Sequence, residues 1–533
     1  MSGARASATI ATGTMVSRVT GLVRTVVLVV ALGSLETPAG NAFAIANQLP
    51  NNIFALVSSG LFAGVLVPQI VKAAAHRDGG SAFVSKLITL GTVAVGAVTL
   101  LAVSLAPLIV LIYSGRMSSD AIALTLAFAY WCLPQLFFLG LYALLGEILN
   151  ARRVFGPYAW SPVVNNIVSI VGFLAFIAVF GPTRSAIGWT PGMIALMAGT
   201  ATAGIAVQTI VLLLFWKRAA LTVRPDFQWR GIGLRQMGRL AGWTFLMVVA
   251  GQIAGAVQVN LVGAASEAGA ASAALQYAWV VFILPYSVIV LSIVTPYYTQ
   301  LSEHAAAGDG AAVHTDLRTS GRIIAMFIVA ALAAMLVAIL PISRVFTDNA
   351  SQSGQFAAIL AAYLLALIPL AIQAPLTRAF FAYHDTFHPF VFTLVQCVLV
   401  VITALIAAAT LPLVWLAFGI ALGQSISNIV QVVLAALLLR RKIGATGVPA
   451  ALQAYASFGM RALPAAAAGA GVAAALGGFG NGTGWALSGI APAIIATALI
   501  GGTVVVVYAL TLIVTRTPEM RPIVQKLRAR LGR

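Results

Sequence analysis

Long stretches with few or no charged residues recur along the whole chain, and they limit the folds that it can adopt. Fourteen of them are long enough for a helix to cross a bilayer, which takes about 20 predominantly apolar residues. They cover approximately 8–35, 39–71, 83–114, 120–149, 155–180, 187–216, 236–263, 269–302, 322–346, 353–382, 388–410, 412–439, 459–476 and 485–515. Because 61% of the 533 residues are hydrophobic and 8% are charged, we predict an all-α, polytopic membrane protein with about 14 transmembrane helices.

The connections between the spans are short and leave no room for a separate soluble domain. Pro285 in the middle of the eighth span corresponds to Pro50 in the second, which suggests a repeat of six spans. We therefore predict an N-terminal lobe of six spans, a C-terminal lobe of six spans, two extra transmembrane helices and a basic cytoplasmic tail. These parts cover 1–217, 218–442, 443–515 and 516–533.

The distribution of lysine and arginine predicts the orientation of the chain. With the N-terminus inside, 25 of the 30 basic residues fall in inner segments, three fall outside and two lie within the first span. The three outer ones are Arg116, Arg184 and Arg344. By the positive-inside rule, we expect a multi-pass protein of the cytoplasmic membrane with both termini cytoplasmic. The net charge of +18 therefore reflects topology, and we expect no nucleic-acid partner.

Residue types that support other chemistries are sparse. Cys132 and Cys397 lie within predicted spans and lack metal-ligand spacing, and the five histidines show none either. The sequence has no nucleotide-binding loop. We predict no catalytic residue, no enzyme activity, no metal and no cofactor. Transport would draw on the membrane potential, on the gradient of the substrate or on an ion gradient, which leaves a coupling monovalent cation open.

Two arginines interrupt the first span. The uncharged run after Arg24 ends at Leu35, which is too short to cross a bilayer, so the span must include at least one arginine. A cation at the centre of a bilayer costs roughly 2.5 to 3.5 kcal/mol, so it usually faces a watery cavity, a partner or a substrate. Arg18 and Arg24 therefore predict a buried anion-binding cavity. Alternatively, a short tilted helix lets both side chains reach the inner interface.

The second span is unusually polar. Asn41, Gln48, Asn52 and Ser59 follow one another at spacings of 7, 4 and 7, which keeps them on one face of a helix. Pro50 removes a backbone hydrogen bond and predicts a bend in the same helix. We interpret the stripe as the wall of a hydrated cavity. Interhelical hydrogen bonds are the alternative role for each single residue.

Several motifs resemble those of the MurJ (MviN) family of lipid II flippases. They are Ser17-Arg-Val-Thr-Gly21-Leu-Val-Arg24, Asn41-Ala-Phe-Ala-Ile-Ala-Asn-Gln-Leu-Pro50-Asn51, Phe62-Ala-Gly-Val-Leu-Val-Pro68, Gly146-Glu-Ile-Leu-Asn-Ala-Arg152 with Pro162-Val-Val-Asn-Asn166, and Arg378-Ala-Phe-Phe-Ala-Tyr-His-Asp-Thr386. The resemblance covers essentially the whole chain. It implies the fold of the multidrug/oligosaccharidyl-lipid/polysaccharide exporter superfamily, with two lobes around a cationic cavity.

The resemblance also implies a function in cell-wall synthesis. A bacterial flippase of this kind moves lipid II, the lipid-linked peptidoglycan precursor, from the inner to the outer leaflet by alternating access. Arg18 and Arg24 match family arginines implicated in recognition of the pyrophosphate, so we expect them to bind it. Asn41, Gln48, Asn52 and Ser59 would line the same site, and Gly21, Pro50 and Pro285 would act as hinges. Membrane lipids and cell-wall synthesis proteins are the other partners expected.

The chain departs from the family pattern in its charges. Thr25 and Asn41 stand where the family commonly has Asp, Gln48 replaces a basic residue, Phe54 and Ala55 occupy the place of an arginine pair, Ser59 replaces a Glu, and Val280 falls where a further arginine is expected. Loss of acidic and basic partners together costs less than loss of one alone. The resemblance therefore implies a divergent branch with a cavity lined by Asn and Gln.

Three other functions stay open on the sequence. The first is a flippase for a different lipid-linked saccharide. The second is a cation-coupled drug exporter of the same superfamily, for which Glu147 is the only candidate mid-membrane carboxylate. The third is a scaffold for cell-wall assembly that transports nothing. For a scaffold, substitutions at Arg18, Arg24 and Gln48 would have no effect, whereas changes in the inner loops would.

Overall fold

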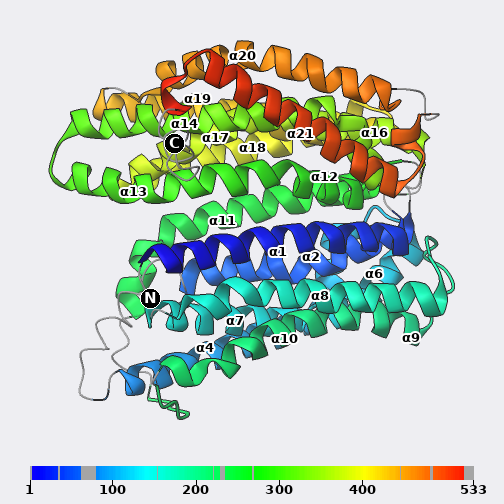
Figure 1. The fold of residues 1–533 in the computed structure, drawn as a ribbon. Helices are drawn as coiled ribbons and strands as arrows, with labels where there is room; N and C mark the ends of the chain where they lie inside the picture. Colours follow the sequence, from blue (N-terminus) through cyan, green and yellow to red (C-terminus); the bar gives the residue numbers. More distant parts are fainter. Residues whose placement is uncertain are drawn as a thin grey trace. The chain divides into compact units, whose positions relative to one another are not determined.

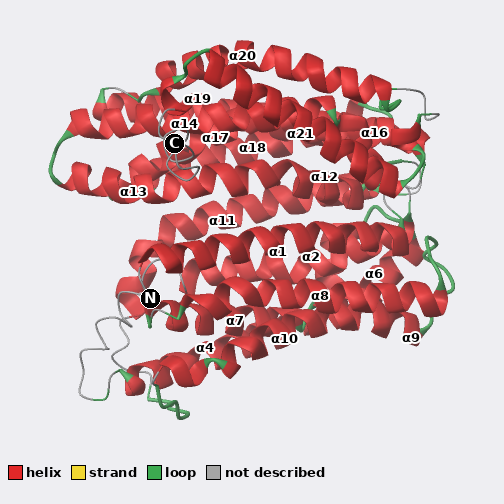
Figure 2. Cartoon of the chain, in the orientation of Figure 1, coloured by secondary structure: helices red, strands yellow, loops and turns green. Residues whose placement is uncertain are grey.

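The computed structural model of the chain is helical throughout the residues that it describes, without a strand among them (Figure 2). The described residues are 3–33, 37–61, 78, 80–152, 154–219, 221–228, 234–266, 269–347, 349–444, 446–479 and 484–520. Thirteen helical segments in this part of the chain are long and apolar enough to cross a membrane. The predicted all-α, polytopic fold is thus confirmed.

Thirteen of the fourteen predicted spans correspond to those segments one by one. The remaining one, the second, corresponds to a 24-residue helix, α2 (Pro38–Leu61). Its predicted continuation to residue 71, with Pro68, lies outside the described residues. The predicted basic tail, 516–533, is described only as far as residue 520.

The chain forms two compact units, Met1–Ala273 and Ala274–Arg533. This division follows from packing, whereas the lobe boundaries drawn above follow from counting spans and stay a prediction. The helices of the first unit are α1 (Gly3–Leu32), α2, α4 (Ser81–Ser104), α5 (Ala106–Ser114), α6 (Ser119–Cys132), α7 (Gln135–Ala151), α8 (Phe155–Phe180), α9 (Pro191–Ile194), η1 (Ala195–Gly199), α10 (Thr200–Leu214), η2 (Trp216–Ala219) and α11 (Leu234–Gly263).

Within the first unit, α1 packs along α8, and α8 in turn packs on α10 (Figure 1). Helix α2 lies against α6, α7 and α11. The fully buried ring of Phe43 on α2 makes edge-to-face contacts with Phe128 and Phe173, at centroid distances of 5.4 and 5.9 Å. Since such pairs add about 0.5–1.5 kcal/mol to the burial of the rings, these contacts hold one side of α2 in the interior of the unit.

The second unit begins within α12 (Ser272–Pro285). It continues with η3 (Tyr286–Val290), α13 (Leu291–Ala306), α14 (Gly310–Val337), α15 (Ile339–Val345), α16 (Ala350–Leu364), α17 (Leu367–Ala382), α18 (Phe387–Thr410), α19 (Leu413–Ile443), α20 (Val448–Ala475), η4 (Trp485–Leu487), α21 (Ile490–Val514) and η5 (Pro518–Met520). Here α14 packs against α17, α20 and α21, and α18 packs against α19. The two predicted extra helices, α20 and α21, are therefore part of this compact unit.

A buried arginine ties together one end of the second unit. Arg344 on α15 is 9% exposed, and its Nε donates to the carbonyl oxygen of Leu487 at 3.0 Å. Its Nη1 donates to the carbonyl oxygen of Thr347. Leu487 is the last residue of η4 and Thr347 lies just beyond α15, and carbonyl groups at such ends lack intrahelical partners. Arg344, predicted as an outer-segment charge, thus satisfies backbone groups in the part of the second unit where α15, α16 and η4 meet.

Candidate functional site

The two arginines of the first span lie on α1, which is continuous through Gly21. The side chain of Arg18 is exposed and that of Arg24 is half-buried. The hydroxyl of Thr25 donates to the carbonyl oxygen of Gly21 at 3.0 Å, which is the usual i−4 side-chain bond of a threonine within a helix. In an ideal helix the two arginines are about 9 Å apart along the axis and roughly 120° apart around it. With α1 in this form, the two side chains leave the helix in different directions.

Helix α8 holds the turn of α1 that carries Arg18. The Nδ2 of Asn166 donates to the carbonyl oxygen of Ser17 and to the Oγ1 of Thr20, both at 3.0 Å. Asn166 is itself buried. These two bonds link neighbouring helices on either side of Arg18 in the sequence, so they fix the rotation of this turn within the first unit.

Asn41 is bound on both sides of its amide. It is fully buried, its Nδ2 donates to the carbonyl oxygen of Thr37 at 3.1 Å, and its Oδ1 accepts from the backbone N–H of Ala273 at 2.8 Å. It therefore holds the beginning of α2 next to the last residue of the first unit. These bonds fit the interhelical alternative, and a contact of Asn41 with substrate stays a prediction.

Further along α2, the polar residues form a short chain of hydrogen bonds. The Nε2 of the exposed Gln48 donates to the Oδ1 of Asn52 at 3.2 Å, and the Nδ2 of Asn52 donates to the phenol oxygen of Tyr113 on α5 at 3.3 Å. The structure thus brings Gln48 and Asn52 together, as their spacing of four predicts. Pro50 is buried within the helix between them. Ser59 lies in α2, and its side chain is outside the described part.

A second polar chain starts from Asn47, on another side of α2. Gln135 at the start of α7 is fully buried and donates through Nε2 to the Oδ1 of Asn47 and the Oγ1 of Thr202, both at 3.1 Å. Thr202 on α10 donates to the carbonyl oxygen of Trp131 at 2.6 Å. The Oε1 of Gln135 has no hydrogen-bond partner among the described residues. This network fixes α2 against α7 and α10.

Uncharged amides and hydroxyls therefore dominate the candidate site. Helix α2 contains no charged residue between Pro38 and Leu61. Amides can donate to and accept from sugar hydroxyls, and can donate to phosphate oxygens, without the cost of burying a charge. The part of the chain that the structure describes has no group of three or more His, Cys, Asp or Glu side chains placed to hold a metal ion. The arrangement is suited to binding a polar ligand.

In the second unit, the predicted hinge at Pro285 coincides with a change of helix type. Residues Tyr286–Val290 directly after it form a π-helical turn. π-helical turns widen the backbone and often occur at functional sites. The structure places an irregularity where the sequence predicts a hinge, and the hinge motion itself stays a prediction.

The family-like motif that begins at Arg378 forms an ionic cluster at one end of the second unit. Asp385, in the connection between α17 and α18, accepts from Nζ of Lys442 on α19 and from the backbone N–H of His388 at 3.1 Å. Its Oδ2 also lies 2.7 Å from Nδ1 of His388. The guanidinium of Arg378 lies over the ring of Tyr298, 5.1 Å from its centroid.

The neighbours of Asp385 in this cluster shift the pKa of its carboxyl, which lies outside the membrane-spanning segments. Partial burial raises the pKa of the Asp385 carboxyl, but the hydrogen bonds from Lys442 and His388 lower it by more. The net pKa of Asp385 lies below its ordinary value. The cluster is therefore an ion pair that links the end of α19 to the connection between α17 and α18.

Sequence reasoning missed Tyr113 and Thr202, and it assigns no contact to Gln135, which is a lone polar residue in an apolar span. Tyr113 on α5 and Gln135 on α7 bond to α2 directly, at separations of 61 and 88 residues, whereas Thr202 on α10 bonds to Gln135. A single polar residue in an apolar span carries no positional signal. Only the packing of the helices reveals these contacts.

Solved structures of transporters share this fold. One described as lipid II flippase MurJ in an inward closed conformation superposes with a TM-score of 0.71 at 19% identity, over 97% of this chain and 99% of that chain. An inward-facing multidrug resistance MATE family transporter of the MOP superfamily has a TM-score of 0.63 at 16% identity, over 80% of this chain and 94% of that chain. Fold and site together thus define a multi-pass membrane protein with the architecture of this transporter class.

The family described as lipid II flippase MurJ matches residues 28–514. The chain belongs to this family. A probable lipid II flippase MurJ of Rickettsia prowazekii is 26% identical over 428 residues, 78% of this chain and 79% of that protein. A probable lipid II flippase MurJ of Rhizobium meliloti is 27% identical over 451 residues, 81% of this chain and 80% of that protein. The chain is accordingly a multi-pass protein of a bacterial inner membrane.

Proposed function

We propose that this chain moves lipid II from the inner to the outer leaflet of the bacterial cytoplasmic membrane by alternating access of a polar cavity. Membership of the lipid II flippase family over residues 28–514 is the observation that carries the proposal. The uncharged polar face of α2 supports it, because the substrate has a sugar headgroup to which amides can hydrogen-bond. The protein would change no covalent bond and would act as a transporter, not an enzyme.

The cation role falls to α1 in this proposal. Arg18 and Arg24 precede the residues that the family match covers, so their role rests on their charge and on their place within an apolar helix. The pyrophosphate of lipid II is an anion, and arginine is suited to bidentate binding of phosphate oxygens. Because α1 is continuous, we propose that the two arginines contact different phosphates, or that α1 unwinds near Gly21 when substrate is bound.

The direction of transport would follow from the membrane potential. With a potential that is negative inside, outward movement of an anion gains about 2.3 kcal/mol per charge per 100 mV. No cofactor is needed for this step. The other coupling that we propose is to a monovalent cation, which would accompany the return of the empty protein to its inward-facing state. With both termini cytoplasmic, the inner segments would be the place where cell-wall synthesis proteins bind.

The test is translocation of lipid II in proteoliposomes, with access of a probe to the headgroup as the readout. We expect Arg24→Ala to slow flipping roughly tenfold or more, because hydrogen bonds to charged groups are worth about 1.5–3 kcal/mol. Arg224→Ala is the matched control, since Arg224 lies exposed in the segment that follows η2. No flipping by folded wild-type protein would contradict the proposal and favour another lipid-linked saccharide or the scaffold role.

A second measurement separates the energy sources. The flipping rate is measured with the potential collapsed by an ionophore, and then with sodium replaced by a large organic cation. A rate that falls only with the potential supports the electrical mechanism. A rate that falls only with sodium assigns the coupling to the cation, and a rate that responds to neither leaves the gradient of the substrate as the driving force.

A further inference from the structure

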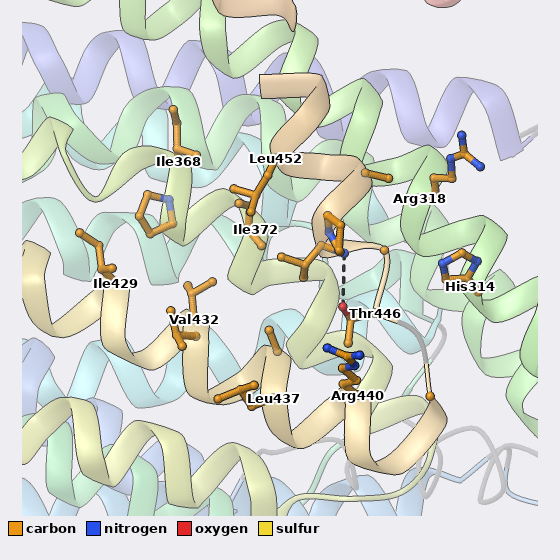
Figure 3. A pocket seen from close by; sticks show the side chains of 18 residues that line it. His314, Arg318, Ile368, Ile372, Ile429, Val432, Leu437, Arg440, Thr446 and Leu452 are labelled. Carbon is orange, nitrogen blue, oxygen red and sulfur yellow. Dashed lines mark hydrogen bonds between the residues drawn. The ribbon is translucent and has the colours of Figure 1, made fainter. Parts of the chain in front are cut away.

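The second unit contains a cavity of about 690 Å³ that the proposed transport does not use. It lies between α14, α17, α19 and the first turns of α20 (Figure 3). Cavities of a few hundred to a thousand Å³ are typical of sites for small molecules. Its walls divide into an apolar part and a cationic part, and this division indicates the chemistry of a ligand.

The apolar part follows one stripe of α19. Ile429, Val433 and Leu437 are spaced by four residues, so they lie on one face of the helix and extend about 12 Å along it. They are 42%, 53% and 53% exposed, and Leu452 across the cavity on α20 is 53% exposed. Exposed aliphatic side chains that line a cavity in a membrane helix leave it open to lipid tails.

The cationic part lies at one end of the same stripe. Arg440 follows Leu437 by three residues, and His314 and Arg318 come from successive turns of α14. Figure 3 shows Arg440 beside Thr446, with His314 and Arg318 on the α14 side of the cavity and the apolar side chains at the other end. The acids of the neighbouring elements are already paired, Asp316 with His304, Glu519 with Arg322 and Asp385 with Lys442. Among the described residues, neither Arg318 nor Arg440 has an acid within ion-pair distance.

The beginning of α20 completes this end. Residues Thr446 to Ala450 line the cavity, and the Oγ1 of Thr446 accepts from the backbone N–H of Val448 at 3.3 Å. The N-terminal turn of a helix carries a partial positive charge and favours an anion nearby. It adds to the two guanidinium groups, so that the positive potential is concentrated where the apolar stripe ends.

We propose that this groove binds an anionic phospholipid of the surrounding bilayer. The phosphate and the glycerol of the headgroup would lie between Arg318, Arg440 and the first turn of α20. One acyl chain would lie along Ile429, Val433 and Leu437. A free phosphate would fill only the cationic end, and a zwitterionic lipid would bring its own cation to the arginines. The site is separate from Arg18, Arg24 and α2, which belong to the first unit.

The experiment uses the full chain in detergent micelles, titrated with dioleoylphosphatidylglycerol or dioleoylphosphatidylcholine, with bound lipid counted by native mass spectrometry. We expect phosphatidylglycerol to bind at least fivefold more tightly. Arg440→Gln should weaken phosphatidylglycerol binding about fivefold, since a basic residue near anionic lipid contributes about that factor. Arg441→Gln removes the same charge from the adjacent residue, which does not line the cavity, and should leave binding unchanged.

A third variant tests the apolar wall. Val433→Trp should fill the groove and reduce phosphatidylglycerol binding without altering the charge, and the unfolding temperature in the absence of lipid checks that each variant is folded. Equal binding of both lipids, equal loss in Arg440→Gln and Arg441→Gln, or unchanged binding in Val433→Trp would each overturn the proposal. Displacement of phosphatidylglycerol by inorganic phosphate would assign the site to a free anion instead. Displacement by lipid II at equal concentration would assign the groove to the transported substrate.

Discussion

Asn166 on α8 donates a hydrogen bond to Thr20 on α1, with 3.0 Å between Nδ2 and Oγ1. The same nitrogen donates to the carbonyl oxygen of Ser17 at 3.0 Å. These partners lie one residue before and two residues after Arg18, so the amide controls which way this turn of α1 faces. The position of the arginine therefore depends on a neutral residue almost 150 positions away in the chain.

Asn166→Leu should consequently lower stability and flipping together. The substitution keeps approximate size and removes both donors, and side-chain hydrogen bonds between membrane helices are worth about 0.6–1.7 kcal/mol. We expect a lower temperature of unfolding in detergent and slower lipid II translocation in proteoliposomes. Asn51→Leu is the control for the unfolding temperature, because Asn51 is exposed and, within the described part of the chain, bonds only within its own helix. An unfolding temperature equal to that of the wild type would contradict the role assigned to Asn166.

The variant Gly21→Ala tests whether α1 unwinds at Gly21 during transport or stays a rigid helix. An added Cβ at residue 21 would meet Nδ2 of Asn166 at 3.5 Å, an ordinary contact, so the fold has room for it. Alanine favours a helix by about 1 kcal/mol over glycine. If α1 must unwind near Gly21 during transport, the variant should be at least as stable as the wild type and flip lipid II more slowly. Normal flipping by a stabilised variant would show that α1 works as a continuous helix.

The matched glycine substitution is Gly204→Ala on α10. There a Cβ would lie 2.4 Å from Oδ1 of Asn165 and 3.0 Å from its carbonyl oxygen, so α8 and α10 must move apart. Overpacking of this kind typically costs about 1–3 kcal/mol. We expect a clear fall in the unfolding temperature of Gly204→Ala and none in Gly21→Ala. The pair thus distinguishes a steric effect from an effect on conformational freedom.

The ion pair of Asp385 with Lys442 should make stability depend on pH in the acid range. Because the pKa of Asp385 is lowered in the folded state, the carboxylate stabilises the fold at every pH well above its unfolded pKa of about 4. That contribution is lost as pH falls through about 4 towards the folded pKa. In unfolding measurements in detergent from pH 7 to pH 3, Asp385→Asn should be less stable at pH 7 and should lose less stability on acidification.

Asp309→Asn is the control for loss of a carboxylate as such. Asp309 caps α14 by accepting from the backbone N–H of Ala312 at 2.9 Å, and asparagine is an equally good N-cap. At pH 7 the unfolding temperature of this variant should stay close to that of the wild type. A pH profile for Asp385→Asn that runs parallel to that of the wild type would mean that the ion pair does not contribute.

Arg344→Leu should destabilise the second unit. The change leaves the carbonyl oxygens of Leu487 and Thr347 without this buried donor, at a cost of about 1–3 kcal/mol for each unsatisfied group. Arg116→Leu removes an exposed arginine from the first unit and should have little effect. The unfolding temperatures of the two variants measure the difference. Equal values would mean that water replaces the guanidinium at those carbonyl groups.

Sequence alone could predict the helices because a transmembrane span is a local property of about 20 residues. It placed Gln48 and Asn52 on one face of a helix, and the hydrogen bond between them agrees with that periodicity. Which residues cover a given face of a helix depends on tertiary packing, and the periodicity of the sequence carries no information about that packing. Asn41 lies on the same predicted stripe and is nevertheless fully buried, because Ala273, more than 200 residues later, packs against it.

For a similar reason, the sequence does not predict which helices pack together into one compact unit. Span counting predicts α20 and α21 as two extra helices but does not say what they pack against; in the structure α20 packs along α14, and α21 packs along α14 and α15. Gly469 illustrates the cause, since a Cβ there would lie 2.4 Å from Cγ2 of Val504 on α21. Small residues allow close approach of membrane helices. The Ala- and Gly-rich composition of α20 is visible in the sequence, but the partner that it approaches is not.

The polar face of α2 is made of carboxamides and hydroxyls, and this choice of groups makes it indifferent to the acidity of the surroundings. Carboxamides exchange no net charge in water, and an arginine stays cationic far beyond neutrality. The charge of this face is therefore the same at acidic and at alkaline external pH. In the proposed function, this face would therefore select its substrate by the shape and number of groups that can be hydrogen-bonded, and that selection would not depend on the external pH.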